Sequence, residues 1–132
     1  MKIAAVTDDG KTISQHFGRA SYYLVVTIED GKIVNRELRE KLGHVHFAGE
    51  PHDPEQSGQH HGYGPASESR HARMAAAIAD CQVLLCGGMG TGAYESMKQR
   101  GVRPIVTDIL SIDEAVQAYL EGAIVDHMER LH

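Results

Sequence analysis

The sequence has few aromatic residues, few cysteines and no long hydrophobic run. Five tyrosines and two phenylalanines are its only aromatic residues, so a core must be built mainly from Val, Ile, Leu, Ala and Met, which suits layers of sheet and helix. No apolar run is long enough to span a membrane. Because Met1–Val6 turns polar at Thr7, this start does not resemble a signal peptide, and we expect a cytoplasmic protein without membrane contact.

Positive charge and thiols are also scarce. The formal net charge is −5 and the pI is about 5.9. Nucleic-acid binding relies on clustered Lys and Arg that neutralise phosphates, so nucleic acid is a poor candidate partner. The two cysteines, Cys81 and Cys86, lie in or beside a predicted buried strand, which favours reduced thiols over a disulfide framework. Two thiols cannot by themselves hold a four-thiolate cluster.

Three strands are expected in the first forty residues. The short apolar run Ile3–Val6 is followed by polar residues and a glycine, which is typical of a central strand that ends in a turn. The pair Asp30-Gly31 separates two β-rich runs, Tyr22–Ile28 and Lys32–Glu40. An Asp-Gly pair in this setting is a strong hairpin signal.

Residues 41–68 change character: they are rich in Gly, Pro, His, Glu and Gln and show almost no apolar periodicity. A loop of this length in a compact domain is usually functional or disordered. After it, helical and strand patterns alternate. The expected segments are a helix at about 69–80, a strand at 83–86, a helix at about 91–100, a strand at 105–107 and a helix between the capping residue Ser111 and Gly122.

The resulting order is βββ-αβαβα, which predicts one α/β domain over residues 1–132, with a mixed five-stranded sheet and a histidine-rich insertion at about 41–68. If the first strand lies beside the fourth, strands one, three, four and five end at the same edge of the sheet. Ligands of open α/β sheets bind at that edge. This order of elements is also that of ribonuclease-H-like three-layer folds.

Six of the nine histidines fall between residues 44 and 71. They include a His-x-His pair, His44 and His46, and a His-His pair, His60 and His61; the others are His52 and His71. Imidazole binds zinc, nickel and copper well, and a loop can wrap a metal ion. Their spacing matches no fixed zinc motif, so a solvated loop without a metal is an equally good interpretation.

Two further segments lie at the expected functional edge. In the segment His16-Phe17-Gly18-Arg19, His16 could ligate a metal and Arg19 could pair with an anion. The glycine-rich turn Gly87-Gly88-Met89-Gly90 follows a strand and opens a helix, where backbone amides can receive an anion. Cys86 ends that strand, where a thiolate could be stabilised and bind a metal; alternatively it is a small buried hydrophobic residue.

The same residues permit two other functions. Gly88, Gly90 and Ala93 fit a G-x-G-x-x-A dinucleotide pattern in the glycine-rich turn 87–92, with Asp108 as the acid that would bind a ribose, although the motif occurs late in a short chain. Asp8, Asp9 and Asp108 could instead hold magnesium in a hydrolase. The acidic net charge disfavours a nucleic-acid substrate, and Asp at a strand end is also ordinary turn chemistry.

Taken together, Met1–Asp8, His16-Phe17-Gly18-Arg19-Ala20, the turn from Cys86 to Gly90 and the closing helix resemble the dinitrogenase iron-molybdenum cofactor biosynthesis family. The resemblance spans the chain apart from the loop. It implies a ribonuclease-H-like fold without nuclease activity, and a role in binding, carrying or storing an iron-molybdenum or related metal-sulfur cofactor. The long histidine-rich loop departs from the shorter connection expected in small members, which leaves a simpler metal ion open as the cargo.

The resulting expectation is a carrier and not an enzyme. His16, Cys86 and the loop histidines would supply ligands, while Arg19 and the amides around Gly88 to Gly90 would neutralise an anionic cluster. A carrier must also release its cargo, so we expect a protein partner that receives it. A regulatory or partner-binding domain in which the histidines have no metal role is the remaining alternative.

Overall fold

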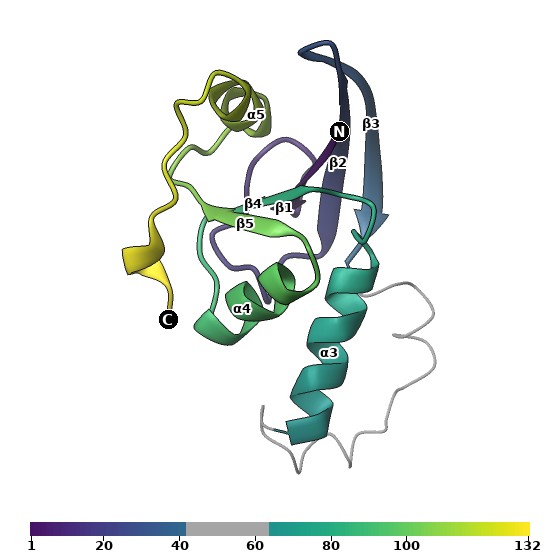
Figure 1. The fold of residues 1–132 in the computed structure, drawn as a ribbon, viewed down its shortest axis with the longest axis vertical. Coiled ribbons are helices and arrows are strands. Elements are labelled where there is room, and N and C mark those ends of the chain that lie inside the picture. The colour runs from purple at the N-terminus through teal and green to yellow at the C-terminus, as the bar shows by residue number, and fades with distance from the viewer. Residues whose placement is uncertain (42–63) are drawn as a thin grey trace.

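The computed structural model describes residues 1–41 and 64–132, and for residues 64–69 the backbone alone. Strands and helices follow the order anticipated from the sequence (Figure 1). The elements are β1 (Lys2–Thr7), β2 (Tyr22–Glu29), β3 (Lys32–Glu40), α3 (Gly64–Ala76), β4 (Val83–Cys86), α4 (Thr91–Gln99), β5 (Arg103–Val106), α5 (Ile112–Leu120) and a short 3-10 helix, η1 (Met128–Arg130).

The five strands form one mixed sheet in the order β3-β2-β1-β4-β5. β1 is antiparallel to β2 and parallel to β4, and β2 is antiparallel to β3. β4 and β5 are parallel, with Cys86 opposite Val106. The chain reverses direction before β2 and again after it, so β1, β3, β4 and β5 all run in the same direction. Their carboxyl ends therefore meet at one edge of the sheet.

The hairpin between β2 and β3 forms where the sequence predicts it. Asp30 has φ 54° and Gly31 has φ 76°, the two positive values that a two-residue turn between antiparallel strands requires. The register of the hairpin shifts between Thr27 and Ile28, which marks a bulge. Beyond the bulge the strands stay paired as far as Glu40, so the hairpin brings the end of β3 to the same edge as the end of β1.

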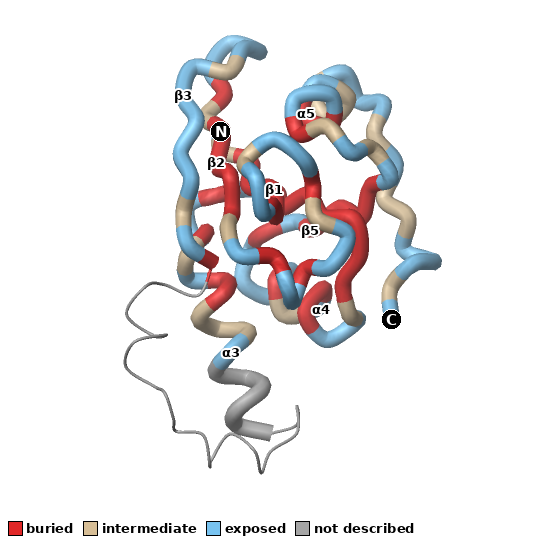
Figure 2. The backbone as a smooth tube through the Cα atoms, turned by 180° about the vertical axis from the view of Figure 1, so that it is seen from behind, coloured by how far each residue is buried: buried red, intermediate tan, exposed pale blue. Residues whose placement is uncertain are grey.

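Hydrophobic side chains cover both faces of the sheet in alternation. On one face Ala4 and Val6 of β1 join side chains from α3 and α4, including Met74 and Met97. On the other face Ile3 and Ala5 join the buried side of α5. The core is thus a helix, sheet and helix sandwich, and the central strands are buried while β3 is largely exposed (Figure 2).

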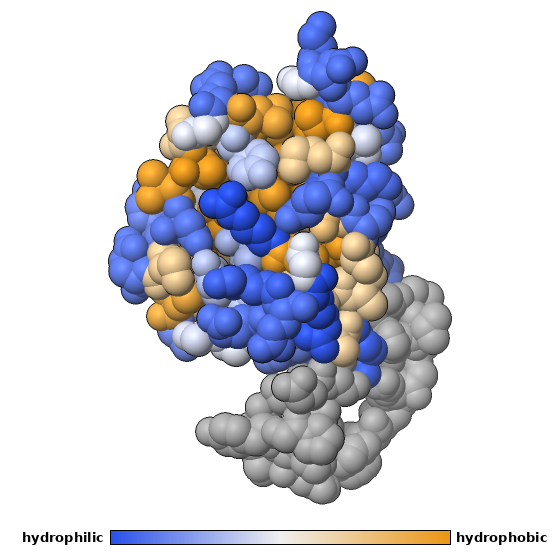
Figure 3. All heavy atoms as spheres, in the orientation of Figure 1, coloured by the Kyte–Doolittle hydropathy of each residue, from blue (hydrophilic) through white to orange (hydrophobic). Residues whose placement is uncertain are grey.

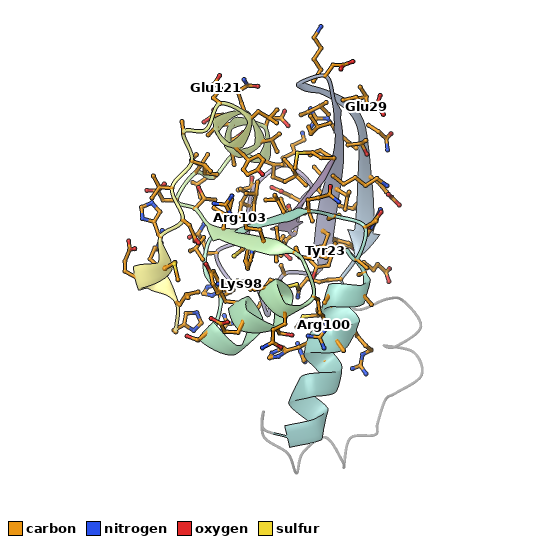
Figure 4. The ribbon with its side chains drawn as sticks, in the orientation of Figure 1. Tyr23, Glu29, Lys98, Arg100, Arg103 and Glu121 are labelled. Carbon is orange, nitrogen blue, oxygen red and sulfur yellow. The ribbon has the colours of Figure 1, made fainter. Side chains whose placement is uncertain are left out.

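Tyr23 ties α3 to the sheet. It is fully buried, and its hydroxyl donates a 2.8 Å hydrogen bond to the backbone carbonyl of Met74 in α3 (Figure 4). Burial raises the pKa of this phenol far above its ordinary value, so the hydroxyl stays protonated as a donor. This bond fixes the C-terminal half of α3 against β2, next to the edge where the strands end.

The segment boundaries differ from the expectation in three places. α3 spans Gly64–Ala76 instead of about 69–80. It ends early because the chain continues in turns after Ala76, and apolar residues there, including Ile78, are buried in the core without belonging to the helix. β5 begins at Arg103, two residues early, since its start is set by pairing with β4. η1 had no signal in the sequence. In contrast, the capping of α5 is confirmed: the Ser111 hydroxyl accepts a hydrogen bond from the amide of Glu114.

Among the residues that the structure describes, no helix combines the length and the hydropathy that a membrane crossing would need. Figure 3 shows that hydrophilic residues occupy much of the visible face and that the hydrophobic ones form separate patches.

Candidate functional site

The loop after β1 is held in place by its own polar residues. The Thr7 hydroxyl donates to the carbonyl of Thr12 at 2.7 Å, and the Asp9 carboxylate accepts from the amides of Lys11 and Thr12. These hydrogen bonds lower the pKa of Asp9 to about 2, so it stays ionised as a fixed turn residue. The chain then returns along β1 with the Ser14 amide bonded to the Val6 carbonyl.

Phe17 anchors the next part of this loop. Its ring is buried in the hydrophobic core beneath α3 and α4, and its amide donates to the carbonyl of Gly88 at 2.9 Å. A turn follows in which the amides of Arg19 and Ala20 both bond to the His16 carbonyl. With Phe17 directed inward, the neighbouring His16 and Arg19 stay exposed at the surface above it.

The glycine-rich turn after β4 packs directly on this loop. The Gly87 amide donates to the Ser14 carbonyl, and the amide of Gly88 is directed at the Cys86 sulfur. The Gly87 amide therefore faces the protein, while anion binding by the Gly88 amide stays a prediction. The amides at the start of α4 lack intrahelical partners, and its cap, Gly90, supplies no side-chain hydrogen bond.

The loop and the turn form two walls of a pocket of about 530 Å³. His16 to Arg19 line one wall, and Met89 and the first turn of α4, residues 90–93, line another. Arg70, His71 and Met74 of α3 form a third wall, and His132 completes the lining. The pocket thus lies at the carboxyl edge of β1 and β4, where the sequence places a ligand site.

The pocket is rich in cationic and soft side chains. Its lining residues include two arginines, three histidines and two nearly buried methionines, and no Asp or Glu side chain of the described residues lines it. The N-terminal end of α4 adds the partial positive charge of its helix dipole. An acidic protein therefore carries a locally positive pocket, whose electrostatics favour an anion.

Two contacts bring α3 to the pocket. Arg70 reaches across it, with a long hydrogen bond of 3.5 Å from its guanidinium to the Gly18 carbonyl. The His71 ring lies against the first turn of α4, since a Cβ added at Gly92 would be 3.6 Å from its Cε1 atom. Sequence reasoning assigned neither Arg70 nor Met74 to the site, and it grouped His71 with the loop, because helical spacing does not reveal which strand end a helix crosses.

Lys41 lies beneath the pocket and was also missed. It follows β3 directly, is only 2% exposed, and its ammonium nitrogen lies 4.9 Å from the centroid of the Phe17 ring. Burial, and then the nearby positive charge of Arg70, lower the pKa of Lys41 to about 8, while Asp8 opposes this shift. The chain therefore holds a buried amine directly behind a residue that lines the pocket.

Cys86 is placed differently from the sequence-based hypothesis. It is fully buried, and its sulfur lies 3.6 Å from the Met89 sulfur and does not line the pocket. Burial raises the pKa of this thiol to about 12, which outweighs the hydrogen bond from the Gly88 amide. This burial favours the alternative interpretation of Cys86 as a small buried hydrophobic residue. Ligation by Cys86 stays a prediction that would require Met89 to move aside.

The acidic residues of the two alternative functions do not converge. The Asp8 carboxylate accepts a hydrogen bond from the Ser21 amide, and the Asp9 carboxylate accepts one from the Lys11 amide within the turn after β1. Asp108 is exposed and lies 3.7 Å from the His127 imidazole instead of lining the pocket. Within residues 1–41 and 70–132, no group of three or more His, Cys, Asp or Glu side chains is arranged to hold a metal ion.

The predicted metal ligands of the histidine-rich segment, His44, His46, His60 and His61, lie outside the described residues, as does His52. A zinc, nickel or copper site there stays a prediction. Of the remaining predicted site residues, His16, Arg19, Met89 and Gly90 are brought together in one pocket, while Cys86, Gly87 and Gly88 lie behind it.

The packing of the turn makes a specific prediction at Gly88. A Cβ added there would be 2.7 Å from the backbone carbonyl oxygen of Gln15, and a backbone atom has little freedom to move. We expect Gly88→Ala to lower the free energy of unfolding by about 1–2 kcal/mol, measured by chemical denaturation. Gly90→Ala is the matched control, because a Cβ at Gly90 has no neighbour within 4 Å and its backbone is extended. Equal stability of the two variants would contradict this packing.

Comparison with known proteins places this fold and pocket in context. Residues 1–122 match the family model described as dinitrogenase iron-molybdenum cofactor. An uncharacterized protein of Methanocaldococcus jannaschii is 32% identical over 124 residues, which cover 94% of this chain and 89% of that protein. Among solved structures, PH0822 is similar with a TM-score of 0.67 and 22% identity, over 96% of this chain and 97% of the other. The apo form of the orange protein of Desulfovibrio gigas has a TM-score of 0.62 and 21% identity, over 93% and 89% of the two chains.

Proposed function

The chain belongs to the dinitrogenase iron-molybdenum cofactor family, and from this premise we propose that it binds and carries an anionic iron-molybdenum or related metal-sulfur cofactor. One observation carries the proposal: a pocket at the carboxyl edge of the sheet is lined by arginines, histidines and methionines and by no described Asp or Glu side chain. Metal-sulfur clusters with bound sulfide are anionic, and they are stabilised by positive charge, by N–H donors and by soft ligands.

The proposed binding residues divide by chemistry. Arg19 and Arg70 would pair with the negative charge of the cargo, and the amides at the start of α4 would donate hydrogen bonds to it. His16, from one wall, and Met89, from another, would offer a borderline and a soft donor to its metal atoms. The similar orange protein was solved in an apo form, a term used of proteins that also have a ligand-bound form.

A carrier is proposed rather than an enzyme, because holding and releasing a cluster needs no general base. The pocket is shallow enough to reach from outside, and His16 and Arg19 on its rim are exposed, so a protein partner could receive the cargo there. We further propose that residues 1–132 act as one cofactor-binding domain. A ribonuclease-H-like description of the fold is part of the same proposal, supported by three initial strands and the central position of β1.

The test is metal and acid-labile sulfide analysis of the protein purified anaerobically from its native host, with an ultraviolet-visible spectrum of the same sample. We expect iron or molybdenum together with sulfide, in a fixed ratio to protein. Zinc, nickel or copper without sulfide would overturn the proposal and move the function to the histidine-rich segment 41–68. Protein without any metal would also contradict carriage of a cluster.

A further inference from the structure

The last ten residues return to the pocket. After α5 ends, the chain runs past the end of β5, forms η1 and descends beside α4 (Figures 1 and 2). The family match ends at residue 122, so this segment lies outside the part of the chain that defines the family. Nevertheless His132 is among the residues that line the pocket. We call residues 123–132 the C-terminal segment.

Asp126 fixes the first half of the C-terminal segment. One oxygen of its carboxylate accepts a 2.8 Å hydrogen bond from the Val106 amide at the end of β5, and the other accepts one of 2.8 Å from the Tyr94 hydroxyl of α4. The adjacent His127 amide donates to the Val106 carbonyl. A single carboxylate therefore joins the last strand, the helix at the pocket and the C-terminal segment.

The second half is fixed against the glycine-rich turn. Leu131 packs on the hydrophobic core that also contains Phe17 and Met89. The His132 amide then donates to the Met89 carbonyl at 3.2 Å. The turn is thus held from two sides, by Phe17 through the Gly88 carbonyl and by His132 through the Met89 carbonyl. This anchoring places His132 among the residues that line the pocket.

We propose that the C-terminal segment completes the anion pocket and that His132 is a further binding residue for its cargo. The proposal rests on the proposed function, because it concerns the same pocket. In this proposal an imidazole N–H of His132 donates a hydrogen bond to an oxyanion or thioanion that is held between Arg19 and the start of α4.

The experiment is calorimetric titration of the full chain with molybdate, a tetrahedral dianion, at low ionic strength. We expect His132→Ala to weaken binding by about tenfold, the effect of losing one hydrogen bond to a charged group, and His132→Gln to recover part of the loss. His127→Ala is the matched control, because that imidazole belongs to the same segment but bonds to Glu129 and does not line the pocket. It should bind molybdate as the unaltered protein does.

A second measurement separates binding from folding. In nitrogen-15 spectra of the histidine side chains, molybdate should shift the His132 signals and leave those of His127 in place, while thermal melting verifies that both variants are folded. If the unaltered protein fails to bind molybdate, the proposed anion pocket itself is refuted. If it binds, and His132→Ala binds equally well without a shift at His132, this inference alone is refuted and the proposed function stands.

Discussion

Arg19→Glu is expected to weaken the binding of molybdate or of the metal-sulfur cargo by about a hundredfold. The substitution removes one charge-assisted pair and places a carboxylate side chain in a pocket that no described Asp or Glu side chain lines. Arg19 is exposed and its amide, not its side chain, holds the loop, so the fold should be retained. Titration calorimetry in parallel with thermal melting measures both effects.

Arg100→Glu is the matched control for this prediction. It changes the net charge by the same amount, but Arg100 caps the C-terminal end of α4, opposite the end that forms the pocket, and bonds to Ser96 (Figure 4). The effect of Arg100→Glu on anion binding should be small and should disappear at high ionic strength, because salt screens an exposed charge at the far end of α4. Equal weakening by both variants would mean that overall charge, and not the pocket, attracts the anion.

Lys41→Met is expected to stabilise the unliganded protein at pH 7 by about 1–3 kcal/mol, because the methionine keeps the apolar stem and removes a charge that is poorly accommodated. The lysine has a pKa of about 8 in the folded protein against 10.5 ordinarily. Between pH 8 and pH 10.5 the lysine is protonated in the unfolded chain and neutral in the folded protein, so folding releases its proton. The Lys41 contribution to stability should therefore be most unfavourable below pH 8, and this penalty should fade as the pH rises past 10.5, where the amine is neutral in both states.

Denaturant unfolding of the unaltered protein and of Lys41→Met between pH 7 and 10.5 measures this, because the buried thiols titrate alike in both; the stability advantage of Lys41→Met should shrink as the pH rises. Lys98→Met is the control: Lys98 also lies over an aromatic ring, 5.4 Å from that of Tyr94, but it is exposed. Its loss should change stability little at any pH. The interpretation of Lys41 would be wrong if its substitution destabilised the protein at pH 7, because the amine would then form a net favourable interaction.

Lys41 and Arg70 suggest how the pocket and the fold are coupled. Phe17 links Lys41 to the pocket, because its ring contacts the Lys41 ammonium and Phe17 is itself a lining residue. Arg70 disfavours a proton on Lys41 when the pocket holds no anion. A bound anion would oppose that repulsion, so cargo binding should be accompanied by some proton uptake near pH 8. The calorimetric titrations reveal this if they are repeated in buffers with different ionisation enthalpies.

The sequence alone determined the elements and the edge at which they meet. The Asp30-Gly31 turn and the Ser111 cap are local features, and both occur in the fold where their residues predict them. The periodic patterns predict the type and order of the elements, while the bounds of α3 and β5 differ. The order of the strands along the chain then made one edge collect the ends of β1 and β4. For this reason the sequence alone predicts that His16, Arg19 and the glycine-rich turn lie at one edge of the sheet.

The tertiary structure decided which of those residues line the pocket. Cys86 is fully buried and, like Gly88, does not line it, which no sequence spacing reveals. Arg70 of α3, Lys41 behind Phe17 and His132 reach the site only through packing between segments far apart in the chain. A pattern records the face on which a residue lies, but desolvation and long-range contacts fix its charge and its neighbours, and these depend on the whole fold.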